Sequence, residues 1–202
     1  MAVVCAGLGF RLHTGWAALV AIAEPDKIEV VLRRRVELLP ADDSIPRFVY
    51  HSAAEMDRAE AAALVKRSAR AAEKTAGAAL RETLDELRRM KIAVKTAGIP
   101  TGSTVPPREL DRILKSHPLI HAAEGALFQA AVARGCQECG LKITTVREKE
   151  LLERAAEACG TEPARFRKSL DDMRKNAGPP WGVDQKTAAA AALLALRLAP
   201  LP

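Results

Sequence analysis

Three strand-like segments follow one another within the first 38 residues, with only short turns between them. Ala2–Leu8 and Gly15–Ala23 are apolar runs of strand length, and a glycine-rich turn separates them. In the third segment every second residue is apolar, with the exception of Arg34; the apolar positions are Ile28, Val30, Leu32, Val36 and Leu38. The pattern predicts an antiparallel meander of three strands at the start of the fold.

Helix-like and strand-like segments alternate in the remainder of the chain. We expect helices over Ser52–Arg89, His117–Arg134, Glu148–Cys159 and Pro163–Lys175, and a closing helix to Leu198 with Asp184 as its N-cap. We expect strands over Lys91–Val94 and Leu141–Val146, and a loop over Thr96–Pro107. This order predicts an α/β fold in one domain of residues 1–202. Its mixed five-stranded sheet has three antiparallel strands and then parallel strands, with helices on both faces.

Charge and composition narrow the classes of function. The formal net charge of +6 favours a polyanionic partner such as DNA or RNA. Only 3% of the residues are aromatic, which leaves few side chains to stack on unpaired bases. The longest apolar stretch, Ala188–Leu196, is too short to span a bilayer. With scattered cysteines and no secretory signal, the sequence predicts a cytoplasmic protein without a membrane partner.

The order of segments is similar to that of the RNase H-like superfamily, and the details resemble its RuvC Holliday-junction resolvase branch. Thr14-Gly15-Trp16 occupies the position of a Thr-Gly-Tyr motif in that family, and counting back from it places Leu8 at the first catalytic Asp. Ile92-Ala93-Val94 resembles the hydrophobic run before the second acid, which places Lys95 at that acid. In the last helix Asp184 corresponds to the first of two aspartates, and Thr187 replaces the second.

The resemblance implies a catalytic site that has lost its metal ligands. Two-metal hydrolysis of a phosphodiester needs clustered carboxylates to hold the ions. Leu8 offers no ligand, Lys95 has the opposite charge, and Thr187 is a weak oxygen donor. We therefore expect no cofactor, and Mg²⁺ or Mn²⁺ only if the protein is an active nuclease. If the registers are right, Lys95 and Asp184 face each other across the former site.

Two other groups of residues carry weaker signals. His117, His121 and Glu124 share a helix face at i, i+4 and i+7, and two histidines four residues apart can bind zinc. A metal set of His121, Glu124 and Asp184 is the corresponding alternative for the site. The isolated pair Cys136 and Cys139 is interpreted as the end of a helix before Gly140, its C-cap.

Three functional hypotheses follow from the sequence. The first is a catalytically degenerate RuvC-like protein that binds structured nucleic acid, with phosphate contacts from Arg11, His13, Lys95 and Lys186. The second is an active metal-dependent nuclease with relocated carboxylates, drawn from Glu124, Asp184, and Glu109 or Glu150. The third is a scaffold or homodimerisation module whose positive charge is only a surface property.

Overall fold

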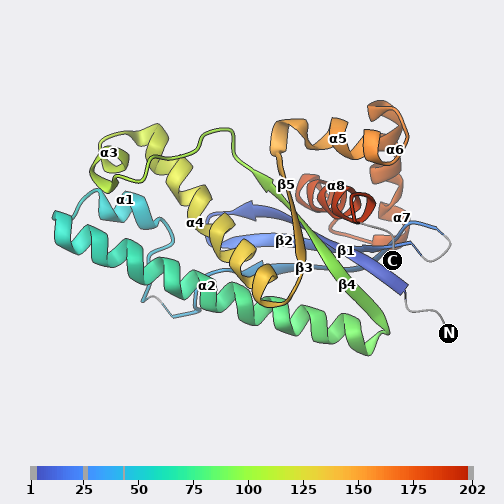
Figure 1. Ribbon diagram of the computed structural model, residues 1–202, viewed down its shortest axis with the longest axis horizontal. Helices are drawn as coiled ribbons and strands as arrows, with labels where there is room; N and C mark the ends of the chain where they lie inside the picture. Colours follow the sequence, from blue (N-terminus) through green and yellow to red (C-terminus); the bar gives the residue numbers. More distant parts are fainter. Residues whose placement is uncertain (1–3, 25–26, 43, 200–202) are drawn as a thin grey trace.

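A computed structural model of the chain describes residues 4–24, 27–42 and 44–199. Its centre is a five-stranded sheet in the order β3-β2-β1-β4-β5 (Figure 1). The strands are β1 Val4–His13, β2 Trp16–Ala23, β3 Glu29–Glu37, β4 Ile92–Thr101 and β5 Lys142–Arg147. β1, β2 and β3 pair antiparallel, while β4 pairs parallel with β1 and β5 parallel with β4. The expected mixed five-stranded sheet, with three antiparallel strands and then parallel strands, is confirmed.

Helices cover both faces of this sheet (Figure 1). They are α1 Val49–Ala53, α2 Arg58–Arg89, α3 Leu110–Leu114, α4 His117–Glu138, η1 Glu148–Glu150, α5 Leu151–Ala158, α6 Pro163–Asp172, α7 Arg174–Ala177 and α8 Val183–Arg197. One apolar core lies between the sheet and α1, α2 and α4, and a second lies between the sheet and α5, α6 and α8. No helix in the described ranges is long and apolar enough to cross a membrane.

The first hairpin differs from the sequence-based expectation. β1 continues through the stretch interpreted as a turn and ends at His13, which pairs with Trp16 across a tight turn. Gly15 in that turn has a φ of 83°, which glycine adopts without strain. Residues 7 to 13 alternate between apolar and glycine or polar, which is the period of a strand with two different faces. Ala2 and Val3 of the expected strand lie outside the described residues.

Two further boundaries were predicted wrongly. β4 runs to Thr101, so the first part of the expected loop Thr96–Pro107 is strand. Its glycine is compatible with a strand here because Gly98 lies against the backbone of α8, which leaves no room for a side chain. The expected helix Ser52–Arg89 is two helices, and Asp57 begins the second by accepting hydrogen bonds from Ala59 N and Glu60 N, both 2.9 Å.

α8 packs directly on the middle of the sheet, on the face opposite α2 and α4. A Cβ atom built on Gly9 would lie 1.8 Å from the carbonyl oxygen of Ala188, and one on Gly98 would lie 2.0 Å from that of Ala191. Small residues on both sides therefore permit backbone-to-backbone contact. The N-cap of α8 is Gly182 and not Asp184, since Gly182 N donates to Gln185 Oε1 at 2.8 Å. Asp184 lies in the first turn instead.

Arg34, the exception on the apolar face of β3, has a structural partner. Its guanidinium forms an ion pair with Glu86 of α2, and Glu82 lies 3.7 Å away. The aliphatic part of a long arginine can cover apolar surface while its charged end reaches solvent-side carboxylates. Arg34 therefore joins α2 to the edge of the sheet.

Candidate functional site

The side chain of Arg11 lies at the centre of a polar network where β1 meets the first turns of α8. Its Nε lies 3.2 Å from Asp184 Oδ1, and its Nη2 lies 3.2 Å from Glu148 Oε1. Its Nη1 donates to Thr187 Oγ1 at 3.3 Å. The Arg11 side chain is only 22% exposed. One guanidinium thus engages the two carboxylates and the hydroxyl at this site.

His13 extends the network toward the hairpin turn. Its Nε2 lies 3.0 Å from the same Asp184 oxygen that Arg11 contacts. Its ring stacks on Trp16 with 4.1 Å between ring centroids and 6° between planes. The guanidinium of Arg35 lies over Trp16 at 4.0 Å from the ring centroid. Asp184 is therefore held by two groups of β1, one of which is fixed by an aromatic stack.

A cavity of about 560 Å³ opens beside this network, between α8, α5 and α6. Arg11, Arg167 and Lys186 supply its cations, and Glu148 and Asp171 supply its carboxylates. Lys186 Nζ lies 2.5 Å from Asp171 Oδ1. Apolar side chains of α5, α6 and α8 form the rest of the wall. The predicted phosphate-binding cations Arg11, His13 and Lys186 do gather at one edge of the sheet, but each has a carboxylate partner.

Leu8 and Lys95 do not join this network. Leu8 is fully buried in the core beneath α2 and α4, whereas its neighbours Gly7 and Gly9 face α8. Lys95 is exposed in a bulge of β4, at the level of Ala6 and Gly7 of β1. At about 3.3 Å per residue, that level is about 15 Å along the sheet from Arg11. The expectation that Lys95 faces Asp184 is therefore wrong, as is its grouping with the other phosphate-binding candidates.

The cause of this error is the end assigned to β4. The sequence pattern placed the end of this strand at Val94, because the following residues contain glycine and proline. The strand continues to Thr101, so its carboxyl end lies much further along the sheet than Lys95. The position occupied by Lys95 is near the beginning of the strand.

The acids considered for a relocated metal site are not gathered either. Glu124 is 3% exposed, and its Oε1 accepts from Tyr50 N at 2.8 Å. Glu150 pairs with Arg147, and Glu109 occupies the N-cap position of α3 without a side-chain capping bond. Within the described residues, the group whose ligand atoms are close enough to hold a metal contains histidines and no carboxylate. The set His121, Glu124 and Asp184 is not formed, because Asp184 bonds to Arg11 and His13.

The oxygen atoms at the α8 site do not suit a pair of divalent ions. Asp184, Glu148 and Thr187 all point to the Arg11 guanidinium, which occupies the space between them. Glu148 was not among the candidates predicted from the sequence. It follows directly after β5, and residues at the carboxyl end of a strand lie at the sheet edge where such sites form. The geometry fits a site whose oxygen atoms are already bound by an arginine and not a two-metal centre.

The two cysteines of the C-x-x-C pair lie at the end of α4, as predicted. Leu141 N donates to Cys136 O at 2.9 Å, and Gly140 has a φ of 73°. Burial, with a smaller contribution from the nearby Cys139, raises the pKa of the Cys136 thiol to about 12. A thiol with so high a pKa is a poor nucleophile and metal ligand.

Two solved structures of RuvC from Thermus thermophilus are similar to this chain. One is a complex with a Holliday junction substrate, with 16% sequence identity, a TM-score of 0.48, and coverage of 96% of this chain and 92% of that one. The other has 16% identity, a TM-score of 0.49, and coverage of 95% and 92%. No protein-family model matches the sequence, and none of the curated proteins compared with it does.

Proposed function

We propose that this protein binds structured nucleic acid without cleaving it. The observation that carries the proposal is the Arg11 bridge, which places a permanent positive charge between Asp184, Glu148 and Thr187. An arginine guanidinium stays protonated throughout the working pH range. It therefore binds both carboxylates and offsets one of their two negative charges without any ion, and a divalent cation would have to displace it.

The resemblance of the Thr14-Gly15-Trp16 turn and of the helix that contains Asp184 to a nuclease family supports the choice of nucleic acid as the partner. The net charge of +6 supports it as well, because a cationic protein attracts the phosphate backbone over a long range. Since Arg11, His13 and Lys186 are paired with carboxylates, we assign phosphate contacts chiefly to cations that have no such partner among the described residues. Lys95, exposed on β4, is one of them.

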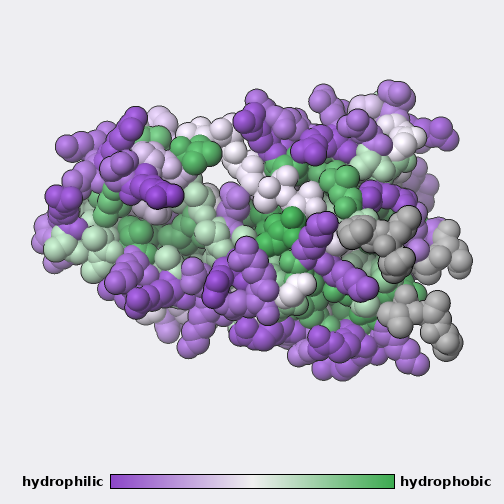
Figure 2. Space-filling view, viewed as in Figure 1, coloured by the Kyte–Doolittle hydropathy of each residue, from purple (hydrophilic) through white to green (hydrophobic). Residues whose placement is uncertain are grey.

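A row of exposed cations on α2 is the strongest candidate for these contacts. Lys66, Arg70 and Lys74 are spaced by four residues and share one face of the helix, with Arg67 beside them. In the described part of the chain, none of the four forms an ion pair, and Glu73 is the acid nearest to them in sequence. The hydrophilic surface along the lower edge of Figure 2 follows the course of α2 in Figure 1.

The charged row gives a quantitative expectation for binding. If four cations each neutralise one phosphate of a duplex, the slope of log affinity against log salt is about −3.6, from about −0.9 per contact. Affinity then falls about 150-fold between about 50 mM and 200 mM salt. A fluorescently labelled four-way junction, a duplex and a single strand serve as the probes in an anisotropy titration.

Charge-reversal variants locate the contacts. The triple variant Lys66→Glu, Arg70→Glu and Lys74→Glu is expected to lose most of the affinity and to flatten the salt slope by about 3. A control with the same net charge reverses three exposed cations on other elements: Lys142→Glu, Arg154→Glu and Arg165→Glu. The assignment to α2 fails if the two triple variants lose affinity equally. The proposal itself fails if no probe binds with a salt dependence near physiological ionic strength.

A further inference from the structure

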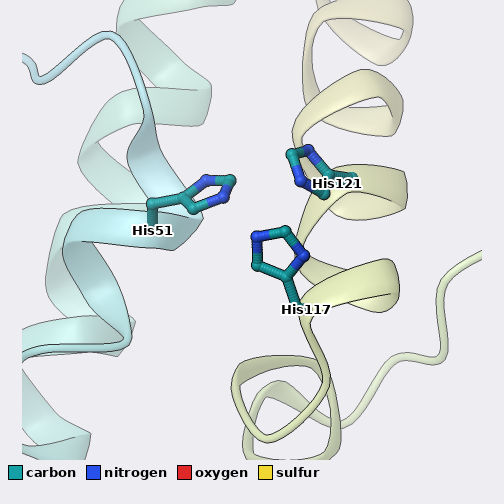
Figure 3. A group of neighbouring side chains, drawn as sticks. All are labelled: His51, His117 and His121. Carbon is teal, nitrogen blue, oxygen red and sulfur yellow. The ribbon is translucent and has the colours of Figure 1, made fainter.

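Three of the four histidines in the chain lie together between α1 and α4, away from the α8 site (Figures 1 and 3). His51 comes from α1, and His117 and His121 come from the first two turns of α4. Each offers a ring nitrogen, and these nitrogens all lie within 4.8 Å of one another. Figure 3 shows the three rings directed toward a common point.

The spacing of these rings is close to what one metal ion requires. Zinc binds imidazole nitrogens at about 2.0–2.1 Å in a tetrahedron, which places ligand nitrogens about 3.4 Å apart. His117 and His121 are exposed, so small rotations of their side chains can close the remaining gap. The i and i+4 positions of His117 and His121 provide two ligands from one helix face, and His51 adds the third from another helix.

Glu124 fixes the position and the tautomer of His51. Its Oε1 accepts from Tyr50 N at 2.8 Å and lies 3.3 Å from His51 Nδ1. A carboxylate bonded in this way favours the proton on Nδ1, which leaves the lone pair of Nε2 free for a metal. A carboxylate behind a metal-binding histidine is a common arrangement in zinc sites. Glu124 is therefore a positioning residue for this group.

The burial of Glu124 gives a second, independent reason to expect a cation. The residue is 3% exposed, and its Oε2 is a buried atom without a hydrogen-bond partner. Among the described residues, no lysine or arginine forms an ion pair with it, and His51 is its one basic partner. A buried carboxylate without a cation is costly. A divalent ion held by His51 would supply the missing positive charge.

We propose that His51, His117 and His121 form a binding site for a divalent transition-metal ion of the zinc type, with Glu124 orienting His51. Three neutral imidazoles suit zinc and its neighbours and do not suit Mg²⁺ or Ca²⁺, which prefer oxygen ligands. The fourth coordination position is left for water or an external ligand. His121 also lines a groove of about 700 Å³ between α4 and residues 100–106.

Zinc and cobalt titrations of the full chain test this site. The wild type is expected to bind one equivalent of Zn²⁺ in a competition assay with a coloured chelator, and Co²⁺ is expected to give the visible spectrum of a tetrahedral nitrogen site. Glu124→Gln keeps the oxygen that accepts from Tyr50 N and is expected to lower zinc affinity about 10- to 100-fold. The double variant His117→Ala and His121→Ala is expected to abolish stoichiometric binding.

The fourth histidine provides the matched control. His13→Asn removes an imidazole that does not belong to this cluster and is expected to bind Zn²⁺ with wild-type affinity. Circular dichroism before each titration shows whether a variant is folded, and His51→Ala replaces any variant that is not. The proposal is overturned if the wild type and the double variant bind Zn²⁺ equally, or if His13→Asn weakens binding as much as the double variant does.

Discussion

Replacement of Gly9 by alanine tests the contact on which the candidate site depends. The new Cβ would lie 1.8 Å from Ala188 O and 2.4 Å from Ala192 N, both of which are backbone atoms of α8. Ordinary contact begins near 3.4 Å, so the helix backbone has to retreat by about 1.6 Å. The same movement would draw Asp184 away from Arg11, because Asp184 lies in the first turn of α8.

Overpacking of a core by one methyl group costs about 1–3 kcal/mol. We expect the upper end, about 3 kcal/mol, since a helix backbone cannot rotate away as a side chain can. For a domain of this size, each kcal/mol lowers Tm by about 2–4 °C, so Gly9→Ala is expected to lower Tm by about 6–12 °C. Differential scanning calorimetry measures the shift.

Gly125 offers a matched control for this substitution. It lies within α4, and a Cβ built there meets no atom within 4 Å. Gly125→Ala is therefore expected to stabilise the protein by up to about 1 kcal/mol, through the higher helix propensity of alanine. Equal Tm values for Gly9→Ala and Gly125→Ala would refute the direct packing of α8 on the sheet.

Three further predictions concern single side chains. Arg11→Met leaves two carboxylates without the guanidinium that binds them. It is expected to lower the free energy of unfolding, measured in urea, by about 2 kcal/mol, which lies between the values for exposed and for buried ion pairs. Mg²⁺ should raise the stability of this variant and not that of the wild type. The raised pKa of Cys136, about 12 against an unfolded value near 9, means that its thiol ionises first in the unfolded chain. Its contribution to stability is therefore complete below about pH 9 and is lost as pH rises toward 12, which denaturant titrations across that range measure. In thiol labelling of the native protein, the exposed Cys5 should react and Cys136 should not. Asp57→Ala removes the two capping bonds at the start of α2 and is expected to cost about 1 kcal/mol in the same urea experiment.

The order of strands and helices could be predicted from the sequence because it rests on local periodicity. The alternation in β3 and the apolar stripe of α2 are repeated several times within one element, so single exceptions such as Arg34 do not hide them. The errors came from glycines at positions 9 and 98, which were interpreted as turn or loop residues. In the structure they lie inside strands, where the absence of a side chain lets α8 pack against the strand backbone. This contact is not visible in the local sequence, because α8 begins at Val183, far along the chain from both glycines.

The candidate sites were only partly predictable for the same reason. Asp184 and Thr187 were placed together correctly, since both lie on one face of one helix. Arg11 was expected to contact phosphate, and its bonds to Glu148 and Asp184 were not foreseen, because they join three distant segments. His51 was missed entirely: it lies on a short helix, and only the packing of α1 on α4 brings it to the other histidines.

The most direct test of the central claim is a cleavage assay on a labelled four-way junction. Protein is added at a concentration that shifts all of the junction into a complex, with Mg²⁺ or Mn²⁺ present, and the strands are then resolved on a denaturing gel. The Arg11 bridge predicts intact strands from a bound junction. Metal-dependent cleavage that Asp184→Asn abolishes would contradict the account, because it would mean that Asp184 holds a catalytic metal ion despite the guanidinium beside it.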